Sequence, residues 1–233
     1  MEKTIFLTED IEVLVASAGG VSTTFLIKAI EQYKKINCPN NTDGYKYLPF
    51  PPLGGRNDLK VLYIYGDPVI ATLSLFRRQY HHTQSHCTQK FEKKKDIIPM
   101  DLTVEHYAAG GLDRLHLADH FHNWHSRYTQ YNTLFIRYED IHTNIQAIAD
   151  YLNLPDTFVS TFPPAKQRKS STGNISDTTL SQLELMYSEL KHFQASLSGT
   201  SFVPAANAVK KLKMNVSSNY RRAYRHYLKR CKS

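Results

Sequence analysis

Apolar residues run in short unbroken stretches at three places in the chain, and polar or turn-forming residues bound each stretch. Strands are predicted there over residues 12–16, 60–65 and 133–138, and each range contains a run of three to five Val, Leu, Ile, Ala or aromatic residues. Unbroken apolar runs of this length are typical of strands that are buried on both faces of a sheet. A fourth strand is predicted over 45–48.

Between these stretches apolar residues recur every three or four positions, which is typical of amphipathic helices. Helices are predicted over residues 23–36, 69–81, 104–131, 144–154 and 176–197. Residues 82–101 are polar, show little apolar periodicity and are predicted to form a mobile loop. Strands that alternate with helices predict an α/β fold with a mainly parallel central sheet, helices on both faces, and ligands at the carboxyl ends of the strands.

The junction between the first strand and the first helix has the composition of an anion-binding loop. Gly19 and Gly20 allow a tight turn in which successive backbone N–H groups converge. Ser22–Thr24 then begin the helix, where unpaired N–H groups and the helix dipole favour negative charge. A Walker A loop ends in Gly-Lys-Ser/Thr, and no Lys or Arg lies between Glu12 and Ile27, which argues against an NTPase or a nucleotide kinase. The alternative is a β-turn-α connection with a plain Ser/Thr helix cap.

Four segments, in this order, resemble the sulfotransferases that use 3′-phosphoadenosine 5′-phosphosulfate (PAPS). Gly19–Leu26 resembles their 5′-phosphosulfate loop, Pro-Lys-Ser-Gly-Thr-Thr-Trp-Leu. Val61–Pro68, followed by Ser74, resembles their 3′-phosphate element, in which a strand, an Arg-Asp/Asn-Pro turn and a helix carry a serine eight residues after the arginine. Arg137–Ile141 nearly repeats their Arg-Tyr-Glu-Asp-Leu, and Arg168–Gly173 resembles their Arg-Lys-Gly-x-x-Gly loop.

This resemblance implies a P-loop-type three-layer fold and transfer of a sulfonate group from PAPS to a hydroxyl of a carbohydrate or small-molecule acceptor. The product would be adenosine 3′,5′-bisphosphate, and no metal ion is implied. The residues that the resemblance assigns to the cofactor are Gly19, Gly20, Val21, Ser22, Thr23, Thr24, Ser74, Arg168, Lys169 and Gly173.

Two charged cofactor ligands of the family are replaced in this chain. The loop lysine is Gly20, and the arginine that would hold the 3′-phosphate is Gly66. Each charge-assisted hydrogen bond to phosphate contributes about 1.5–3 kcal/mol, so the loss of both weakens binding by several powers of ten unless other residues substitute. Arg77 and Arg78 are the candidates, because they follow Ser74 by one helical turn. The alternative is that both arginines cap a solvated helix C-terminus.

The catalytic base of the family is also replaced. Its histidine, in a Lys-Thr-His-Leu-Pro segment, corresponds to Tyr47 in Tyr45–Pro49. A neutral phenol is a poor base near pH 7, and Asp43 is the nearest carboxylate that could serve instead. Asp43 has an alternative role as a turn residue in Asn41–Gly44. The three replacements together favour a second hypothesis, a catalytically inactive sulfotransferase-like protein that binds a nucleotide or polyanion.

Cysteine usage and hydropathy indicate a soluble cytoplasmic protein without a transmembrane segment. Cys38, Cys87 and Cys231 are widely spaced and odd in number, which favours a reducing compartment. No apolar signal core and no run of about 18 apolar residues is present. His116 and His120 lie four residues apart, but the other histidines complete no compact ligand set, and we predict no metal site.

Positive charge is concentrated at the C-terminal end of the chain. The 233 residues carry a formal net charge of +8, and ten of the 29 Lys and Arg residues follow Glu189, after which no acidic residue occurs. The remaining 19 basic residues face 21 acidic ones. We therefore predict an α/β domain over 1–202 and a basic helical extension over 203–233 that binds an anionic partner. The near-neutral domain argues against dedicated nucleic-acid binding.

Overall fold

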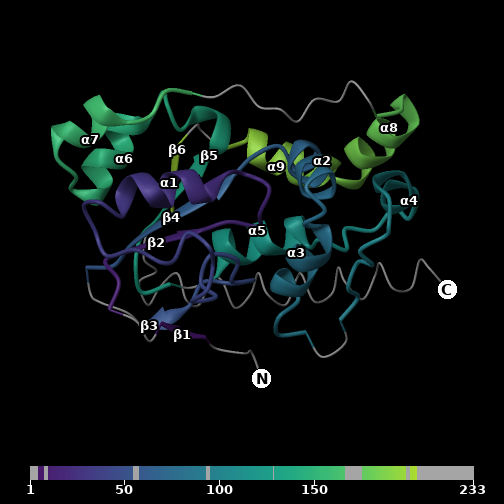
Figure 1. The fold of residues 1–233 in the computed structure, drawn as a ribbon, viewed down its shortest axis with the longest axis horizontal. Coiled ribbons are helices and arrows are strands. Elements are labelled where there is room, and N and C mark those ends of the chain that lie inside the picture. Colours follow the sequence, from purple (N-terminus) through teal and green to yellow (C-terminus); the bar gives the residue numbers. More distant parts are fainter. Residues whose placement is uncertain are drawn as a thin grey trace.

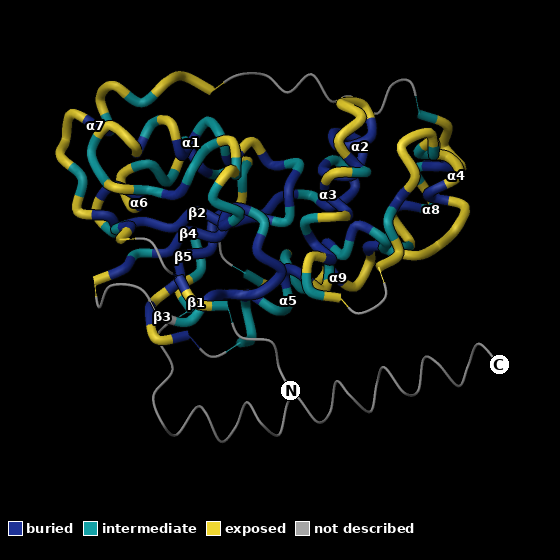
Figure 2. The backbone as a smooth tube through the Cα atoms, turned by 60° about the horizontal axis from the view of Figure 1, so that its bottom comes forward, coloured by how far each residue is buried: buried dark blue, intermediate teal, exposed yellow. Residues whose placement is uncertain are grey.

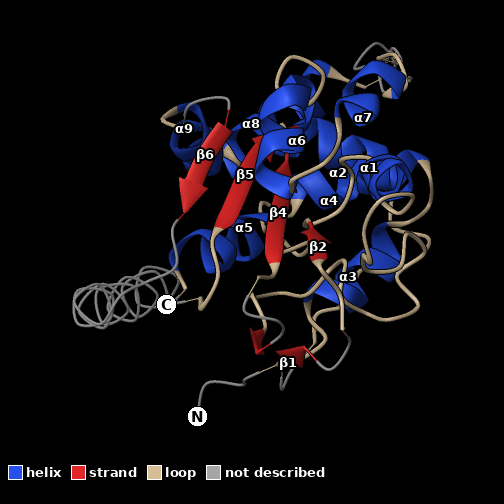
Figure 3. Ribbon diagram, turned by 90° about the vertical axis from the view of Figure 1, so that its left-hand side faces the viewer, coloured by secondary structure: helices blue, strands red, loops and turns tan. Residues whose placement is uncertain are grey.

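A four-stranded sheet lies at the centre of the computed structural model, which describes residues 5–7, 10–54, 58–92, 95–127, 129–165, 175–197 and 200–203 (Figure 1). Strands β2 (Val13–Ala16), β4 (Lys60–Tyr65) and β5 (Thr133–Arg137) are parallel and neighbours in that order. Strand β6 (Thr200–Val203) pairs antiparallel with β5, as its opposite direction in Figure 3 shows. The three strands predicted from apolar runs are confirmed, and the sheet is mainly parallel.

Helices cover both faces of this sheet, which confirms the predicted layers. Figure 1 shows α1 and α6 on one side of the strands and α5 on the other. The helices of the described residues are α1 (Thr23–Ile30), α2 (Pro68–Arg77), α3 (His81–Thr88), α4 (Val104–Ala109), α5 (Leu117–Ser126), α6 (Ile145–Leu152), α7 (Asp156–Thr161), α8 (Asp177–Met186) and α9 (Ser188–Ala195). The smaller elements are a 3-10 turn (Tyr138–Asp140) and a parallel pair of short strands, β1 (Phe6–Leu7) and β3 (Leu53–Gly54).

Aromatic side chains fill the layer between the sheet and α5. Tyr63 of β4 and Phe135 of β5 are register partners with ring centroids 4.8 Å apart. Phe121 and Trp124 of α5 pack on Tyr63 at 5.7 and 5.5 Å, and all four residues are buried. Figure 2 shows β2, β4 and β5 as buried along most of their length. Because burial of each large apolar side chain contributes about 1.5–3 kcal/mol, this layer makes the sheet a firm support for the loops at its edges.

Two long helices of the sequence prediction are each interrupted, and a third is shorter than predicted. The helix predicted over 104–131 is α4 and α5, because Gly111 (φ +62°) and His116 (φ +55°) take left-handed backbone conformations between them. The helix predicted over 176–197 divides into α8 and α9 at Tyr187. The helix predicted over 23–36 ends at Ile30, and turns follow it.

The interruptions place polar residues in a buried network. Asp113, between α4 and α5, accepts hydrogen bonds from the phenol of Tyr187 at 3.0 Å and from the Ala118 N–H at 2.9 Å. The phenols of Tyr187 and Tyr107 lie 2.9 Å apart, and burial raises the pKa of the Asp113 carboxyl. Buried polar groups of this kind require partners, and the break in the helix supplies them.

Two further sequence predictions are corrected by the structure. Residues 45–48 form turns and not a strand, because the Asp43 carboxylate accepts hydrogen bonds from the Cys38 and Tyr45 N–H groups and holds the chain in a loop. The polar stretch 82–101 contains most of α3 and is not one continuous loop. Its helical period escaped detection because the buried side chains of α3 are polar: His81, Gln84, Ser85 and Thr88.

Candidate active site

The chain turns sharply between the carboxyl end of β2 and the start of α1. Gly19 (φ +95°), Gly20 (φ +76°) and Ser22 (φ +52°) all have left-handed backbone conformations. Residues other than glycine adopt such conformations at an energetic cost, so Gly19 and Gly20 are required by the turn itself. Backbone turned in this way directs N–H groups toward a common point, which is the geometry of an anion-binding loop. We call Gly19–Thr24 the phosphate loop.

Two helices press closely on the phosphate loop. A Cβ atom at Gly20 would lie 2.7 Å from the Ala71 carbonyl oxygen of α2, and one at Gly19 would lie 2.6 Å from Cδ of Gln84 in α3. Gln84 Nε2 also donates a hydrogen bond to the Ala18 carbonyl oxygen at 2.8 Å. The loop is therefore held in shape by α2 and α3, with no space for larger residues at either glycine.

The three hydroxyl residues of the phosphate loop face different surroundings. Ser22 is exposed at the N-cap of α1, and its hydroxyl makes no capping hydrogen bond. Thr23 is buried and shares a hydrogen bond with the phenol of Tyr47, whereas Thr24 accepts a hydrogen bond from Lys46. The Ser22 hydroxyl thus remains available to a ligand beside the N-terminus of α1.

Lys46 is the functional candidate that sequence reasoning missed. It is 3% exposed, and its ammonium group donates hydrogen bonds to Thr24 Oγ1 at 2.5 Å and to the Pro39 carbonyl oxygen at 2.9 Å. Burial and the positive charge of Arg78 lower the pKa of Lys46 to about 8. No carboxylate of the described residues lies within 4.0 Å of this ammonium group.

A buried ammonium group without a paired carboxylate is costly unless an anion neutralises it. Lys46 contacts Thr24 of the phosphate loop. Its ammonium group therefore lies near the loop in which Gly20 replaces the family's lysine. The available signal was a lysine directly before Tyr47, the residue that corresponds to the family's histidine. The Lys46 side chain contacts the loop because residues 45–48 form turns. The sequence prediction had placed a strand there, so it did not indicate this contact.

A cavity of about 590 Å³ extends from the phosphate loop along α1 to α7, and we call it the nucleotide cavity. Its lining residues are Ser22, Thr24, Phe25, Lys28, Ala29, Gln32, Tyr33, Arg78, Phe158, Thr161, Phe162 and Pro163. Two of these residues are cations and none is acidic. Arg78 is steadied by a hydrogen bond from its Nε to the Ser74 carbonyl oxygen at 3.0 Å. The cavity therefore favours a ligand with negative charge.

Aromatic rings form part of the wall of the nucleotide cavity. Phe25 and Phe162 meet edge to face with ring centroids 5.2 Å apart, and His142 lies 5.3 Å from Phe162. Tyr33 and Phe158 meet in the same way at 5.8 Å. Stacking of a nucleobase on an aromatic side chain contributes about 1–3 kcal/mol, so this wall suits a flat base.

The structure brings together some of the predicted 3′-phosphate residues and separates others. Arg78 lines the nucleotide cavity, whereas Arg77 is not among the lining residues, and Ser74 is buried. Gly66 lies in a crowded place, because a Cβ there would be 3.1 Å from Cγ1 of Val21. The predicted residues Arg168, Lys169 and Gly173 lie outside the described residues.

The two predicted catalytic candidates have other roles in the loop 38–47. Burial raises the pKa of Tyr47 to about 12, so its phenol stays neutral and is suited to donate a hydrogen bond and not to accept a proton. The Asp43 carboxylate is engaged by the Cys38 and Tyr45 N–H groups, which is the turn role considered as its alternative. Neither arrangement is that of a general base.

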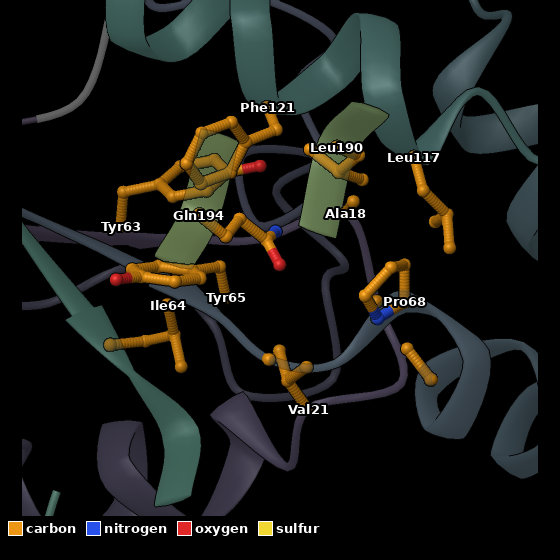
Figure 4. A pocket seen from close by; sticks show the side chains of 13 residues that line it. Ala18, Val21, Tyr63, Ile64, Tyr65, Pro68, Leu117, Phe121, Leu190 and Gln194 are labelled. Atoms are coloured by element: carbon orange, nitrogen blue, oxygen red, sulfur yellow. The ribbon is translucent and has the colours of Figure 1, made fainter. Parts of the chain in front are cut away.

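A small cavity of about 20 Å³ lies behind the phosphate loop (Figure 4). Its walls are mostly apolar, with Val21, Tyr65, Phe121 and Leu190 around it and the Gln194 amide directed inward. This volume admits about one water molecule, so it is too small for a substrate.

The histidines considered for a metal site contact other side chains and do not gather around a common point. His120 is buried, accepts or donates a hydrogen bond at 2.9 Å with the Tyr63 phenol, and burial lowers its pKa to about 3. His116 pairs with Asp119 at 3.4 Å. Within the described ranges, no three His, Cys, Asp or Glu side chains gather in a group that could hold a metal ion.

The fold and this site define an α/β protein with a left-handed glycine turn at the carboxyl end of β2 and a cationic, aromatic cavity beside that turn. The family model described as "Sulfotransferase domain" matches residues 28–224, which is most of the chain. The chain therefore belongs to the sulfotransferase domain family. The match begins after the phosphate loop. It also extends past residue 202, so the boundary predicted there between the α/β domain and the C-terminal extension stays a prediction.

No curated protein and no solved structure matches the chain. None of the helices in the described part of the chain has both the length and the apolar character needed to cross a lipid bilayer. The family assignment thus rests on the family model, and the roles of individual residues rest on their geometry.

Proposed function

We propose that this protein transfers a sulfonate group from PAPS to a hydroxyl group of a carbohydrate or small-molecule acceptor. The observation that carries the proposal is the left-handed turn of the phosphate loop beside a cationic, aromatic cavity. A sulfotransferase family member needs a place for a nucleotide that carries phosphate and sulfonate groups. The phosphate loop and the nucleotide cavity supply that place in adjoining parts of the molecule.

Each part of the donor has matching residues in this arrangement. The N–H groups of the phosphate loop and the Ser22 hydroxyl would bind the 5′-phosphosulfate, and Lys46 and Arg78 would supply positive charge. The adenine base would stack on Phe25 or Phe162 at the aromatic wall. Electrostatic stabilisation and alignment for in-line displacement at sulfur are the forms of catalysis that these groups provide.

Residues outside the described ranges complete the proposal through the family resemblance. Arg168, Lys169 and Gly173 would hold the 3′-phosphate together with Ser74. The basic segment 203–233 would bind an anionic partner, and the unpaired thiols of Cys38 and Cys87 agree with a reducing compartment such as the cytoplasm.

The test is isothermal titration calorimetry of the full chain with adenosine 3′,5′-bisphosphate and, separately, adenosine 5′-phosphate. We expect the bisphosphate to bind more tightly than the monophosphate. Arg168→Ala should weaken bisphosphate binding at least tenfold, which is the roughly 1.4 kcal/mol expected from the loss of one charged hydrogen bond, and should barely change monophosphate binding.

Two results of this titration would count against the proposal. No detectable binding of either nucleotide would contradict it, since every enzymatic version requires the nucleotide. Equal losses for both nucleotides in Arg168→Ala would place Arg168 outside the 3′-phosphate site.

A second candidate function is favoured by Gly20, Gly66 and Tyr47, which replace charged or catalytic residues of the family pattern. An inactive member of the family would bind the bisphosphate and fail to transfer sulfonate. Release of the bisphosphate from PAPS, measured beside the titration, separates this candidate from the enzyme.

A further inference from the structure

A second cavity has Tyr47 among its lining residues, and we call it the acceptor cavity. It measures about 490 Å³, and its lining residues are Asn41, Gly44, Tyr47, His82, Thr83, His86, Cys87 and Lys90. Two contacts join it to the phosphate loop. The Tyr47 phenol shares a hydrogen bond with Thr23, and α3, which forms one wall, holds Ala18 through Gln84.

Few groups in the acceptor cavity are able to take up a proton near neutral pH. Burial raises the pKa of the Tyr47 phenol to about 12 and also raises the pKa of the Cys87 thiol, so both stay protonated. No carboxylate is among the lining residues. His82 and His86 are the lining residues whose neutral side chains have a ring nitrogen that can accept a hydrogen bond.

The hydrogen bonds of α3 distinguish these two histidines. His82 Nδ1 lies 2.8 Å from the Ile98 carbonyl oxygen. A carbonyl oxygen can only accept, so Nδ1 carries the hydrogen and, in the neutral ring, Nε2 keeps its lone pair. His86 is exposed, lies edge to face with His82 at 4.8 Å, and has no hydrogen bond within the described residues that would fix its tautomer.

We propose that the acceptor cavity receives the hydroxyl group of the acceptor and that His82 is the general base. This inference rests on the proposed sulfonate transfer. His82 Nε2 takes the proton as the hydroxyl oxygen forms its bond to sulfur. The bond between sulfur and the bridging 5′-phosphate oxygen breaks, and its electron pair leaves on the bisphosphate. The products are a sulfate ester, adenosine 3′,5′-bisphosphate and the His82 imidazolium. The volume of the cavity suits a single sugar or phenol group.

The experiment uses PAPS alone, with water as the acceptor in the same cavity, and measures release of adenosine 3′,5′-bisphosphate from the full chain. General bases contribute about 10²–10⁴-fold to rate. We expect His82→Asn, which keeps a donor for the Ile98 carbonyl, to lower the release rate at least 100-fold. His106→Asn, at a histidine of α4 that lines neither cavity, should lower it less than fivefold. Imidazole added to His82→Ala should restore part of the rate, which a purely structural role of His82 would not allow.

Calorimetry with the bisphosphate separates this inference from the proposed function. His82→Asn should bind the bisphosphate with wild-type affinity, because His82 lines the other cavity. The inference is overturned if His82→Asn keeps the wild-type release rate, if both asparagine variants lose the same activity, or if the wild-type protein binds the bisphosphate but releases it from PAPS no faster than buffer does. A wild-type protein that binds no bisphosphate contradicts the proposed function itself.

Discussion

Substitution of Gly20 by alanine is expected to abolish tight nucleotide binding and to destabilise the fold. The new methyl group would lie 2.7 Å from the Ala71 carbonyl oxygen and 2.9 Å from its Cα, and neither backbone atom can move without shifting α2. The left-handed conformation (φ +76°) adds a further cost for any residue with a Cβ. Overpacking and backbone strain together should lower the free energy of unfolding by about 2–4 kcal/mol, which corresponds to a fall of about 5–15 °C in Tm.

The matched control for this substitution is Gly111→Ala. Gly111 also has a left-handed conformation (φ +62°), but a Cβ there meets no atom within 4 Å. The free energy of unfolding of Gly111→Ala should therefore fall by about 1 kcal/mol, and its nucleotide affinity should stay unchanged. Thermal denaturation and calorimetry on both variants check these effects. A Gly20→Ala protein that binds the bisphosphate within threefold of the wild type would show that the phosphate loop is not the binding element.

Substitution of Lys46 by methionine is expected to weaken binding of adenosine 3′,5′-bisphosphate by about 10–100-fold, because a charge-assisted hydrogen bond contributes about 1.5–3 kcal/mol. Folding should not suffer at pH 7. The lost ammonium group is buried, and the Pro39 carbonyl oxygen still accepts a hydrogen bond from Thr24 Oγ1 at 3.3 Å. Lys60→Met is the control, since Lys60 begins β4 and so lies at the amino end of the parallel strands, whereas the phosphate loop follows the carboxyl end of β2. Equal affinities of the two variants would contradict the role of Lys46.

The pKa of Lys46 predicts how binding and stability change with pH. The anion prefers the protonated lysine, so wild-type affinity should fall as pH rises through about 8, and this fall should be weaker in Lys46→Met. The pKa is lowered in the folded protein from 10.5 to about 8, so the unfolded chain binds more protons between these values. Lys46 therefore makes the folded state more stable as pH rises from about 8 to 10.5. Titrations and denaturation curves at pH 7 and 9 measure both effects.

The central strands and the phosphate loop could be predicted because their signals are local. Apolar runs predicted β2, β4 and β5. The pair Gly19-Gly20 predicted a tight turn with left-handed backbone, a conformation that other residues adopt only at an energetic cost. The alternation of strands and helices then predicted a mainly parallel sheet, which the structure confirms. These features depend on neighbouring residues in the sequence, which sequence patterns describe well.

Other features depend on contacts between distant residues. The helix α3 buries polar side chains, so hydrophobic periodicity gave no sign of it, although its Gln84 holds the phosphate loop. Lys46 reaches Thr24 because the Asp43 carboxylate turns the loop, and no spacing rule predicts that reach. Arg78 could be predicted as a candidate, but its separation from Arg77 depended on where α2 ends. The extra strand β6 pairs with β5 from far along the chain.

A crystal structure of the full chain with adenosine 3′,5′-bisphosphate tests the central claim most directly. The account predicts the 5′-phosphate over Gly19–Thr24, with Lys46 Nζ within hydrogen-bonding distance of a phosphate oxygen and the adenine stacked on Phe25 or Phe162. A bisphosphate bound elsewhere, with the loop closed by one of its own side chains, would contradict the account.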